Sequence, residues 1–420
     1  MAAEQARTDE PDRLLNIFSR VTSPKHHPLY LAGTGLVFGT GCVLGPVVGG
    51  AFADSKATWR WAFYINLVIC GAFAPVYFFV LKSLSLQPNR TILSKIKKFD
   101  WAGVLLNAGT YSFFVMGLTF GGTKWAWNSG ETISFLLLSV VFTVVYGIQQ
   151  WYCLFTTPES RIFPVELLKS RTQWLLHIGT ACGATAFFIP LYYIPLYYQF
   201  VHAENGVESA VRLLPFILVG IFSMMLNGAV MSATGIYMPW YVAAGGFQII
   251  GGAVYYACVD VTTSDATMYG FSVLITLGGC LAQQAGYSIS AFKAGPTQAS
   301  EATGFINVAQ TGGAMFALTL SSTIFQNVGR NKLQGALADH DVASADIRAL
   351  LTGQRNQIFA SADLEIKTLA IETIVETMNV VYILVVAAGA LALVSSFFLK
   401  REKLNLQPEN NEKPDLETAL

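Results

Sequence analysis

Residues 39–50 read GTGCVLGPVVGG and place five glycines and one proline within twelve residues. The stretch lies inside an otherwise apolar segment of the chain. In water, glycine and proline weaken an isolated helix by roughly 1 and 3 kcal/mol respectively. In lipid, by contrast, small residues allow helix backbones to approach closely and become the preferred contact surface. The role of this stretch therefore depends on the solvent in which the chain folds.

The composition of the chain indicates that this solvent is a lipid bilayer. Hydrophobic residues make up 53% of the 420 residues and charged residues only 12%, whereas an ordinary soluble domain carries about 25% charged residues. The mean hydropathy is +0.48. Lysine and arginine (26) balance aspartate and glutamate (26), so no net field favours nucleic acid as a partner. Charges form short clusters between long apolar runs, which is typical of a multi-pass membrane protein.

Ten apolar runs are each close to or above the ~20 residues with which a helix crosses the bilayer core. They cover residues 30–53, 61–81, 100–120, 131–153, 172–200, 208–232, 239–258, 268–292, 302–326 and 377–399. The alternating pattern of a transmembrane barrel does not occur in them. We therefore predict an all-α integral membrane protein with about ten transmembrane helices.

Basic residues predict the orientation of these helices. With a cytoplasmic N-terminus, the cytoplasmic loops and tail hold Lys25, Lys82, Arg90, Lys95, Lys97, Lys98, Arg161, Lys169, Arg171, Lys293, Lys400, Arg401 and Lys403. The opposite short loops hold only Lys56, Arg60 and Lys124. Because positive charge concentrates on the cytoplasmic side, we expect both termini in the cytoplasm.

The opening stretch now has two interpretations in lipid. Gly41, Gly45 and Gly49 recur at four-residue spacing and form one flat stripe, and Pro46 allows a bend beside it. The first interpretation is a generic small-residue packing face, which GxxxG alone would favour. The fuller pattern G-x3-G-P-x2-G-G is more specific and supports a second one.

GCVLGPVVGG (41–50) resembles the antiporter motif in the fifth helix of drug:proton antiporters of the major facilitator superfamily. Three further segments are similar to those of its fungal fourteen-helix members: TWRWAFYINL (58–67), LTFGGTKWAWNS (118–129) and PLYYQF (195–200). The resemblance assigns the antiporter motif to Gly41, Gly45, Pro46, Gly49 and Gly50. It assigns a segment at the outer mouth to Trp59, Arg60, Trp61 and Asn66.

The resemblance also implies the domain organisation. Aligning the motif with the fifth helix leaves no counterpart for the first four, so we expect an incomplete N-terminal half and a complete six-helix C-terminal half. The expected segments are 1–29 (cytoplasmic), 30–81 (two helices of the N-terminal half), 82–99 (basic cytoplasmic linker), 100–153 (inserted helix pair), 154–171 (cytoplasmic linker), 172–399 (C-terminal half, with an extracellular loop at 327–376) and 400–420 (cytoplasmic tail).

Polar residues within the C-terminal half predict a cavity, because polar side chains at membrane depth face a partner or water rather than lipid. The candidates are His177, Tyr193, Tyr197, Gln199, Asn227, Gln283, Gln284, Asn307 and Gln310. Each has a structural alternative: the histidine and amides can bond between helices, and tyrosines anchor membrane interfaces.

The sequence contains no HExxH, GxSxG or P-loop motif, so we expect no enzyme, no ATP site, no cofactor and no metal. The resemblance implies proton-antiport efflux of a toxin, drug or secondary metabolite by alternating access. The partners would be the lipid bilayer, protons and a small amphipathic substrate, with the plasma membrane as the location. Two alternatives remain: uptake of a siderophore or another small molecule, and a truncated membrane protein without transport activity.

We predict that the sequon Asn89-Arg90-Thr91, the only one in the sequence, carries no glycan. It lies in the basic linker 82–99, which the charge pattern places in the cytoplasm, away from the glycosylation machinery. A glycosidase digest followed by electrophoresis measures this directly. A mass shift on digestion would reverse the orientation of every span.

Overall fold

The computed structural model describes residues 40–41, 44–45, 47–52, 55–56, 58–76, 78, 99–158, 160–295, 298–340, 342, 344–351 and 364–404. Pro46, the sequon at Asn89 and the predicted segment 1–29 lie outside the described residues. So do most of the first predicted span and residues 405–420 of the tail.

The described part of the chain is built from helices, and none of its named elements is a strand, so the predicted all-α class is confirmed. The α-helices are α4 (Trp61–Pro75), α6 (Trp101–Phe120), α7 (Gly130–Tyr152), α8 (Arg171–Val201), α9 (Gly206–Val211), α10 (Leu214–Thr234), α11 (Met238–Cys258), α12 (Asp265–Cys280), α13 (Gln283–Ala294), α14 (Ala299–Ala336), α15 (Ser344–Leu351), α17 (Leu364–Val381) and α18 (Ile383–Phe397). Two short 3-10 helices, η3 (Val165–Lys169) and η4 (Ala338–His340), lie between them.

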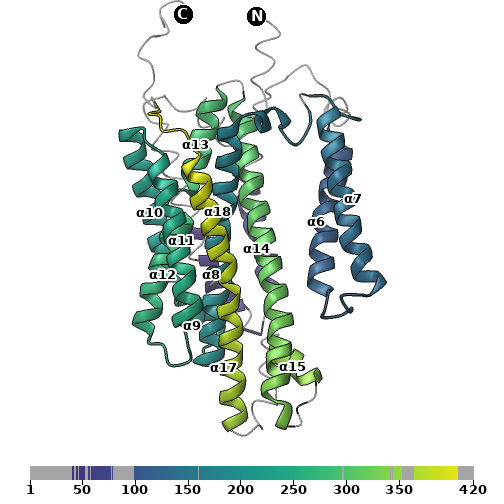
Figure 1. Cartoon of the computed structure of the whole chain (residues 1–420), viewed down its shortest axis with the longest axis vertical. Coiled ribbons are helices and arrows are strands. Elements are labelled where there is room, and N and C mark those ends of the chain that lie inside the picture. Colours follow the sequence, from purple (N-terminus) through teal and green to yellow (C-terminus); the bar gives the residue numbers. More distant parts are fainter. Residues whose placement is uncertain are drawn as a thin grey trace, which may run out of the picture.

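Within these described residues, six helical stretches are long and apolar enough to cross a membrane. They are Trp101–Phe120, Gly130–Tyr152, Arg171–Val201, Gly206–Met231, Asp265–Ala294 and Leu364–Phe397. Helix α4 is apolar but shorter. Helices α11 and α14, which are not among the six, run within the same bundle as α8, α10 and α12 (Figure 1). Each predicted span from 61–81 onward therefore coincides with a helix or a pair of consecutive helices.

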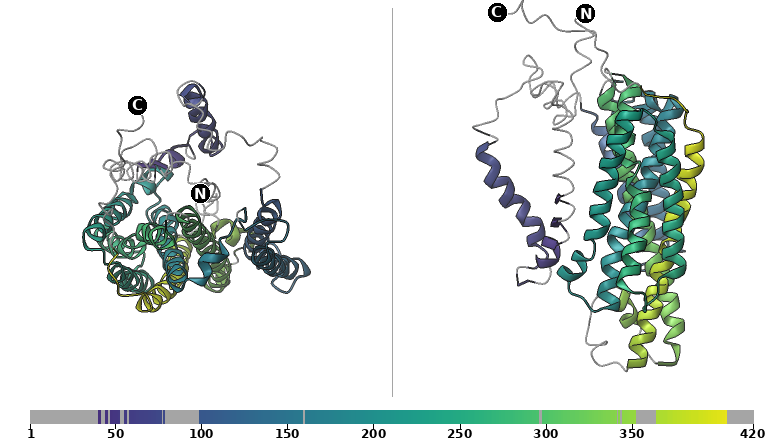
Figure 2. Two further views of the ribbon diagram at one scale, coloured as in Figure 1. Left: turned by 90° about the horizontal axis from the view of Figure 1, so that it is seen from above. Right: turned by 90° about the vertical axis from the view of Figure 1, so that its left-hand side faces the viewer.

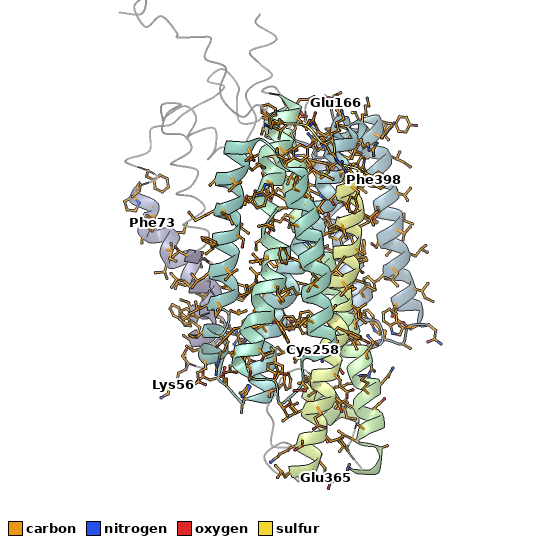
Figure 3. All side chains as sticks on the ribbon, turned by 60° about the vertical axis from the view of Figure 1, so that its left-hand side comes forward. Lys56, Phe73, Glu166, Cys258, Glu365 and Phe398 are labelled. Carbon is orange, nitrogen blue, oxygen red and sulfur yellow. The ribbon has the colours of Figure 1, made fainter. Side chains whose placement is uncertain are left out.

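Helices α8 to α18 form one bundle, and the pair α6–α7 stands beside it next to α14 (Figures 1 and 2). Helix α4 lies apart from the bundle on another side (Figure 2). Glu166 and Phe398 lie toward one end of the bundle, and Cys258 and Glu365 lie toward the other (Figure 3). We call these the Glu166 end and the Cys258 end.

Glycines of α11 bring the bundle helices together. A Cβ atom built on Gly245 would lie 2.7 Å from the backbone nitrogen of Leu393 in α18. One built on Gly251 would lie 2.7 Å from the Cα of Ile275 in α12. Because apolar helices gain no hydrophobic energy from one another in lipid, such close backbone contacts supply the packing energy.

The predicted span 268–292 is interrupted. Leu281 and Ala282 separate α12 from α13, and the break leaves the carbonyl of Gly278 without its helical partner. The Nε2 of Gln248 in α11 donates to this carbonyl over 2.9 Å. A buried amide thus satisfies the polar group that the break exposes, as the membrane interior requires.

The region 327–376, predicted as an extracellular loop, contains parts of helices α14 and α17. Helix α14 continues to Ala336, and α17 already begins at Leu364, so both extend at the Cys258 end (Figure 1). Lys332 of α14 pairs with Glu376 of α17 over 2.9 Å. The side chain of Glu376 is 66% exposed, so this ion pair contributes little to stability.

At the Glu166 end, residues 400–404 cross the turn between α10 and α11. The backbone N–H of Leu404 donates to the carbonyl of Gly235 over 2.9 Å. Glu402 accepts hydrogen bonds from the hydroxyl of Tyr237 and from the ammonium group of Lys293 in α13. The bond from Lys293 lowers the pKa of Glu402. We call residues 400–404 the tail strap.

The pair α6–α7 is attached to α14 through its turn, the segment 121–129. The indole of Trp127 donates to the Oδ1 of Asn327 over 3.2 Å, and Asn327 Nδ2 donates to the carbonyl of Gly121 over 3.4 Å. The guanidinium of Arg330 donates to the carbonyl of Gly122. The GGTKWAWNS segment noted in the sequence therefore docks the hairpin onto α14.

We predict that Gly122→Ala loosens this turn, because Gly122 has φ +72° and its Cβ would lie 1.9 Å from Asn327 Oδ1. Trypsin should then cut the detergent-solubilised protein after the exposed Lys124 about five to ten times faster. Gly130→Ala is the matched control, because its Cβ meets no described atom within 4 Å. Equal cleavage rates for the two variants would contradict the docking role.

Candidate functional site

The antiporter stretch touches the bundle at Gly50. A Cβ built there would lie 2.6 Å from both the carbonyl carbon and the oxygen of Gly206, and 3.0 Å from the nitrogen of Val207. These are backbone atoms at the start of α9, so they cannot swing away as a side chain can. The contact joins the N-terminal segment to the C-terminal bundle at the Cys258 end.

The predicted stripe is not the contact surface in the described part of the chain. A Cβ built on Gly41, Gly45 or Gly49 meets no described atom within 4 Å. Gly41 and Gly45 are exposed. The close approach expected from the sequence is found one residue beyond the stripe, at Gly50, and a packing role for the stripe itself stays a prediction.

The predicted outer-mouth segment lies at the surface. Trp59, Trp61 and Asn66 are exposed, and the guanidinium of Arg60 lies over the Trp59 ring, 5.0 Å from its centroid. The Trp61 ring stacks on Phe52 with centroids 6.5 Å apart. This stacking holds the start of α4 against the end of the antiporter stretch.

Tyr193 and Tyr197 lie in the packed core of the bundle. Both are buried, and the Tyr197 hydroxyl donates to the carbonyl of Asp260 over 2.7 Å. They line a cavity of about 10 Å³ together with Tyr255 and Tyr382. That volume admits about one water molecule. The Nε2 of Gln199 donates to Ser209 Oγ of α9 over 2.9 Å.

His177, Asn227 and Gln283 are polar groups held within the bundle. The imidazole of His177 packs on Phe305 of α14 with ring centroids 4.4 Å apart. Asn227 and Gln283 are buried. One polar atom of each residue, His177 Nδ1, Asn227 Nδ2 and Gln283 Oε1, has no hydrogen-bond partner among the described residues. Gln283 opens α13 directly after the helix break.

The remaining candidates form an accessible polar row on α13 and α14. The hydroxyl of Tyr287 donates to Gln310 Oε1 over 2.5 Å and lies 3.3 Å from Asn307 Oδ1. Asn307 and Gln284 are exposed. We call Gln284, Tyr287, Asn307 and Gln310 the amide–phenol row. The structure thus brings together Asn307 and Gln310, which were predicted from the sequence, through Tyr287, which was not predicted. Gln284 precedes Tyr287 by about one helical turn on α13.

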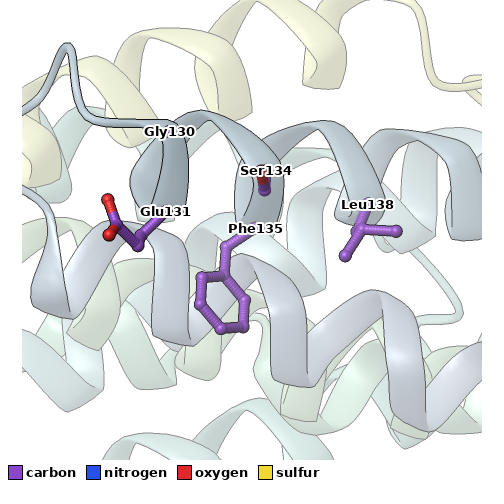
Figure 4. Close-up of a pocket in the computed structure, with 5 residues that line it drawn as sticks. All are labelled: Gly130, Glu131, Ser134, Phe135 and Leu138. Carbon is purple, nitrogen blue, oxygen red and sulfur yellow. The ribbon is translucent and has the colours of Figure 1, made fainter.

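A shallow hollow of about 540 Å³ lies elsewhere, along α7 (Figure 4). Its lining residues, Gly130, Glu131, Ser134, Phe135 and Leu138, come from that helix alone. A ligand pocket usually encloses its ligand with polar groups that converge from several elements. This hollow is therefore not the candidate site.

An all-helical bundle with several helices long and apolar enough to cross a membrane defines a multi-pass membrane protein. The family model described as Major Facilitator Superfamily matches residues 14–318. The chain belongs to this superfamily, as the sequence resemblance predicted, and it is a membrane transporter.

Similar proteins extend the comparison. The chain is 39% identical to the "Efflux pump patC" of Aspergillus clavatus over 92% of its own length and 70% of that protein. It is 37% identical to the "Efflux pump alnA" of Emericella nidulans, over 94% of the chain and 71% of that protein. A solved bacterial homolog to human lysosomal transporter, Spinster, is 16% identical with a TM-score of 0.48, over 91% of this chain and 73% of that chain.

We predict that Gly50→Val destabilises the protein, because its side chain must push apart two backbones that now touch. Overpacking of this kind costs about 1–3 kcal/mol, which should lower the midpoint of thermal unfolding in detergent. Gly49→Val, its neighbour without a described contact, is the control and should unfold at the wild-type temperature. A lower midpoint for Gly49→Val than for Gly50→Val would instead indicate that the predicted stripe makes the contact.

Proposed function

We propose that the protein exports a small amphipathic compound, such as a secondary metabolite, toxin or drug, in exchange for protons. Relatives that cover over nine-tenths of the chain are named efflux pumps, which supports export over uptake. The antiporter motif at residues 41–50 supports proton exchange. The chain spans about 70% of the length of those relatives at 37–39% identity.

The amide–phenol row is the observation that carries this proposal. Gln284 is exposed inside the membrane-length stretch Asp265–Ala294, and Asn307 is exposed inside the 38-residue helix α14. Gly304 and Thr311, one turn to either side of Asn307, are exposed as well. Polar groups facing hydrocarbon would be costly, so this face is expected to border water or substrate. Its neutral donors and acceptors suit an uncharged or weakly polar molecule.

Alternating access would use the contacts found at the two ends. With the termini in the cytoplasm of a plasma membrane, the Glu166 end faces inward and the Cys258 end faces outward. The tail strap joins α10, α11 and α13 at the inner end, and the contact of Gly50 with Gly206 closes the outer end. The break between α12 and α13 gives the wall beside the row a point at which it can bend.

We predict that Tyr287→Phe reduces efflux about fivefold, because it removes the hydroxyl that donates to Gln310 Oε1, a loss of about 1 kcal/mol. The assay is efflux of a fluorescent amphipathic compound from vesicles under an imposed pH gradient, with and without a protonophore. Tyr256→Phe, an exposed tyrosine of α11, is the matched control.

Wild-type efflux that survives the protonophore would rule out proton exchange. Equal efflux from Tyr287→Phe and Tyr256→Phe would show that the amide–phenol row does not contact the substrate.

A further inference from the structure

Basic side chains gather where α8 begins and α18 ends, at the Glu166 end of the bundle (Figure 3). The guanidinium of Arg171, the first residue of α8, lies over the ring of Phe398, 5.4 Å from its centroid. Four further cations lie within two residues of Arg171 or within five of Phe398 along the chain. All five are exposed, and we call them the basic patch: Lys169, Arg171, Lys400, Arg401 and Lys403.

The carboxylates next to the basic patch in the sequence have other partners. Glu166 pairs with Arg161 over 3.3 Å. Glu402 accepts a hydrogen bond from the ammonium group of Lys293. In the part of the chain that the structure describes, no carboxylate forms an ion pair with a member of the basic patch. The patch therefore presents positive charge that an external anion can neutralise.

An apolar stripe on α18 leads up to the basic patch. Leu391, Val394 and Phe398 are all exposed, and their spacing of three and four residues places them on one face of the helix. We call these three residues the α18 stripe. Because Arg171 lies over Phe398, positive charge stands directly at the end of this apolar surface.

The basic patch also lies at the depth where the bundle leaves the hydrocarbon. Arg171 begins one membrane-length stretch, Arg171–Val201, and Phe397 ends another, Leu364–Phe397. Trp174, about one helical turn after Arg171 on α8, is exposed, and tryptophan is enriched at the boundary between hydrocarbon and water. A ligand held here can therefore contact the lipid interior and the aqueous surface at once.

These two features together match a ligand with a negative head and an apolar body. We propose that the basic patch binds the headgroup of an anionic phospholipid, with its phosphate on Arg171 and its acyl chains along the α18 stripe. A guanidinium can form two parallel hydrogen bonds with a phosphate. Lys169 and Lys400 add the positive charge that favours an anionic headgroup over a zwitterionic one. The predicted orientation places this end at the cytoplasmic leaflet, where anionic lipids are concentrated.

The chain itself contains a second source of negative charge. Residues 405–420 carry four acidic side chains against one basic side chain, Lys413; the acidic ones are Glu409, Glu412, Asp415 and Glu417. This segment is mainly polar, so it matches the charge of the basic patch but not the exposed α18 stripe. A phospholipid matches both and is the ligand that the surface favours.

Native mass spectrometry of the full chain in detergent tests the site without any transport measurement. The two probes are dioleoyl-phosphatidylserine and dioleoyl-phosphatidylcholine. The wild type should bind the serine lipid about tenfold more tightly than the choline lipid. Arg171→Gln should weaken binding of the serine lipid about fivefold, and Arg171→Gln with Lys400→Gln about 25-fold, because each basic residue near an anionic lipid contributes about a factor of five. Binding of the choline lipid should stay unchanged in both variants.

Two further variants separate the site from a general effect of charge or of misfolding. Lys124→Gln removes an exposed lysine that also lies over aromatic rings, in the turn between α6 and α7, and should keep the wild-type affinity. Arg171→Lys keeps the charge and should lose less affinity than Arg171→Gln. Glycerophosphoserine, the headgroup without acyl chains, should compete poorly with the serine lipid.

Three results would overturn the lipid site. The first is equal affinity of the wild type for the two lipids. The second is an equal loss of affinity for the serine lipid in Arg171→Gln and Lys124→Gln. The third is competition by glycerophosphoserine as strong as competition by the lipid itself, which would indicate a site for a free phosphate ester.

A full-length variant tests whether the acidic segment occupies the basic patch instead. It combines Glu409→Gln, Glu412→Gln, Asp415→Asn and Glu417→Gln. The expected result is the same preference for the serine lipid as in the wild type. A preference that is absent from the wild type and present in this variant would show that the chain covers its own basic patch, and would overturn the proposal.

Discussion

The membrane interior offers no water to an unpaired polar group, and most of this structure follows from that constraint. Where α12 is interrupted, Gln248 bonds the carbonyl of Gly278 that the break exposes. The bundle helices meet through glycines such as Gly245 and Gly251, because a residue without a side chain lets two backbones touch. Stability thus comes from close backbone contact between helices rather than from the transfer of apolar surface out of water.

Under the same constraint, the polar groups in the middle of the bundle differ from those at its two ends. Along the middle, the polar groups are neutral: the amides of Asn307 and Gln310 and the phenol of Tyr287. Full charges that hold helices together stand at the ends, with Lys293 and Glu402 at one and Arg212 and Glu204 at the other.

The sequence was informative where a property is local. Runs of apolar residues predicted the helices, because the composition of each span by itself indicates that the span lies in lipid. The motif at 41–50 predicted the family. Contacts between distant residues were not visible. Nothing in the spacing of Gly41, Gly45 and Gly49 shows that Gly50 is the residue that touches Gly206, and Glu204, Arg212 and Asp265 are separated by up to 61 positions (265 − 204). Tyr287 could have been found, because it lies one turn beyond Gln283.

The tail strap has a practical consequence for anyone who attaches a reporter to this protein. The N–H of Leu404 is bonded to Gly235, and a Cβ on Gly235 would lie 2.4 Å from the carbonyl oxygen of Leu404, so the chain is pressed against the α10–α11 turn up to that residue. A fluorescent protein or affinity tag fused within residues 400–404 would pull Glu402 away from Lys293 and alter the end of the bundle that it was meant only to label. The same fusion placed beyond Leu404 would leave that contact in place.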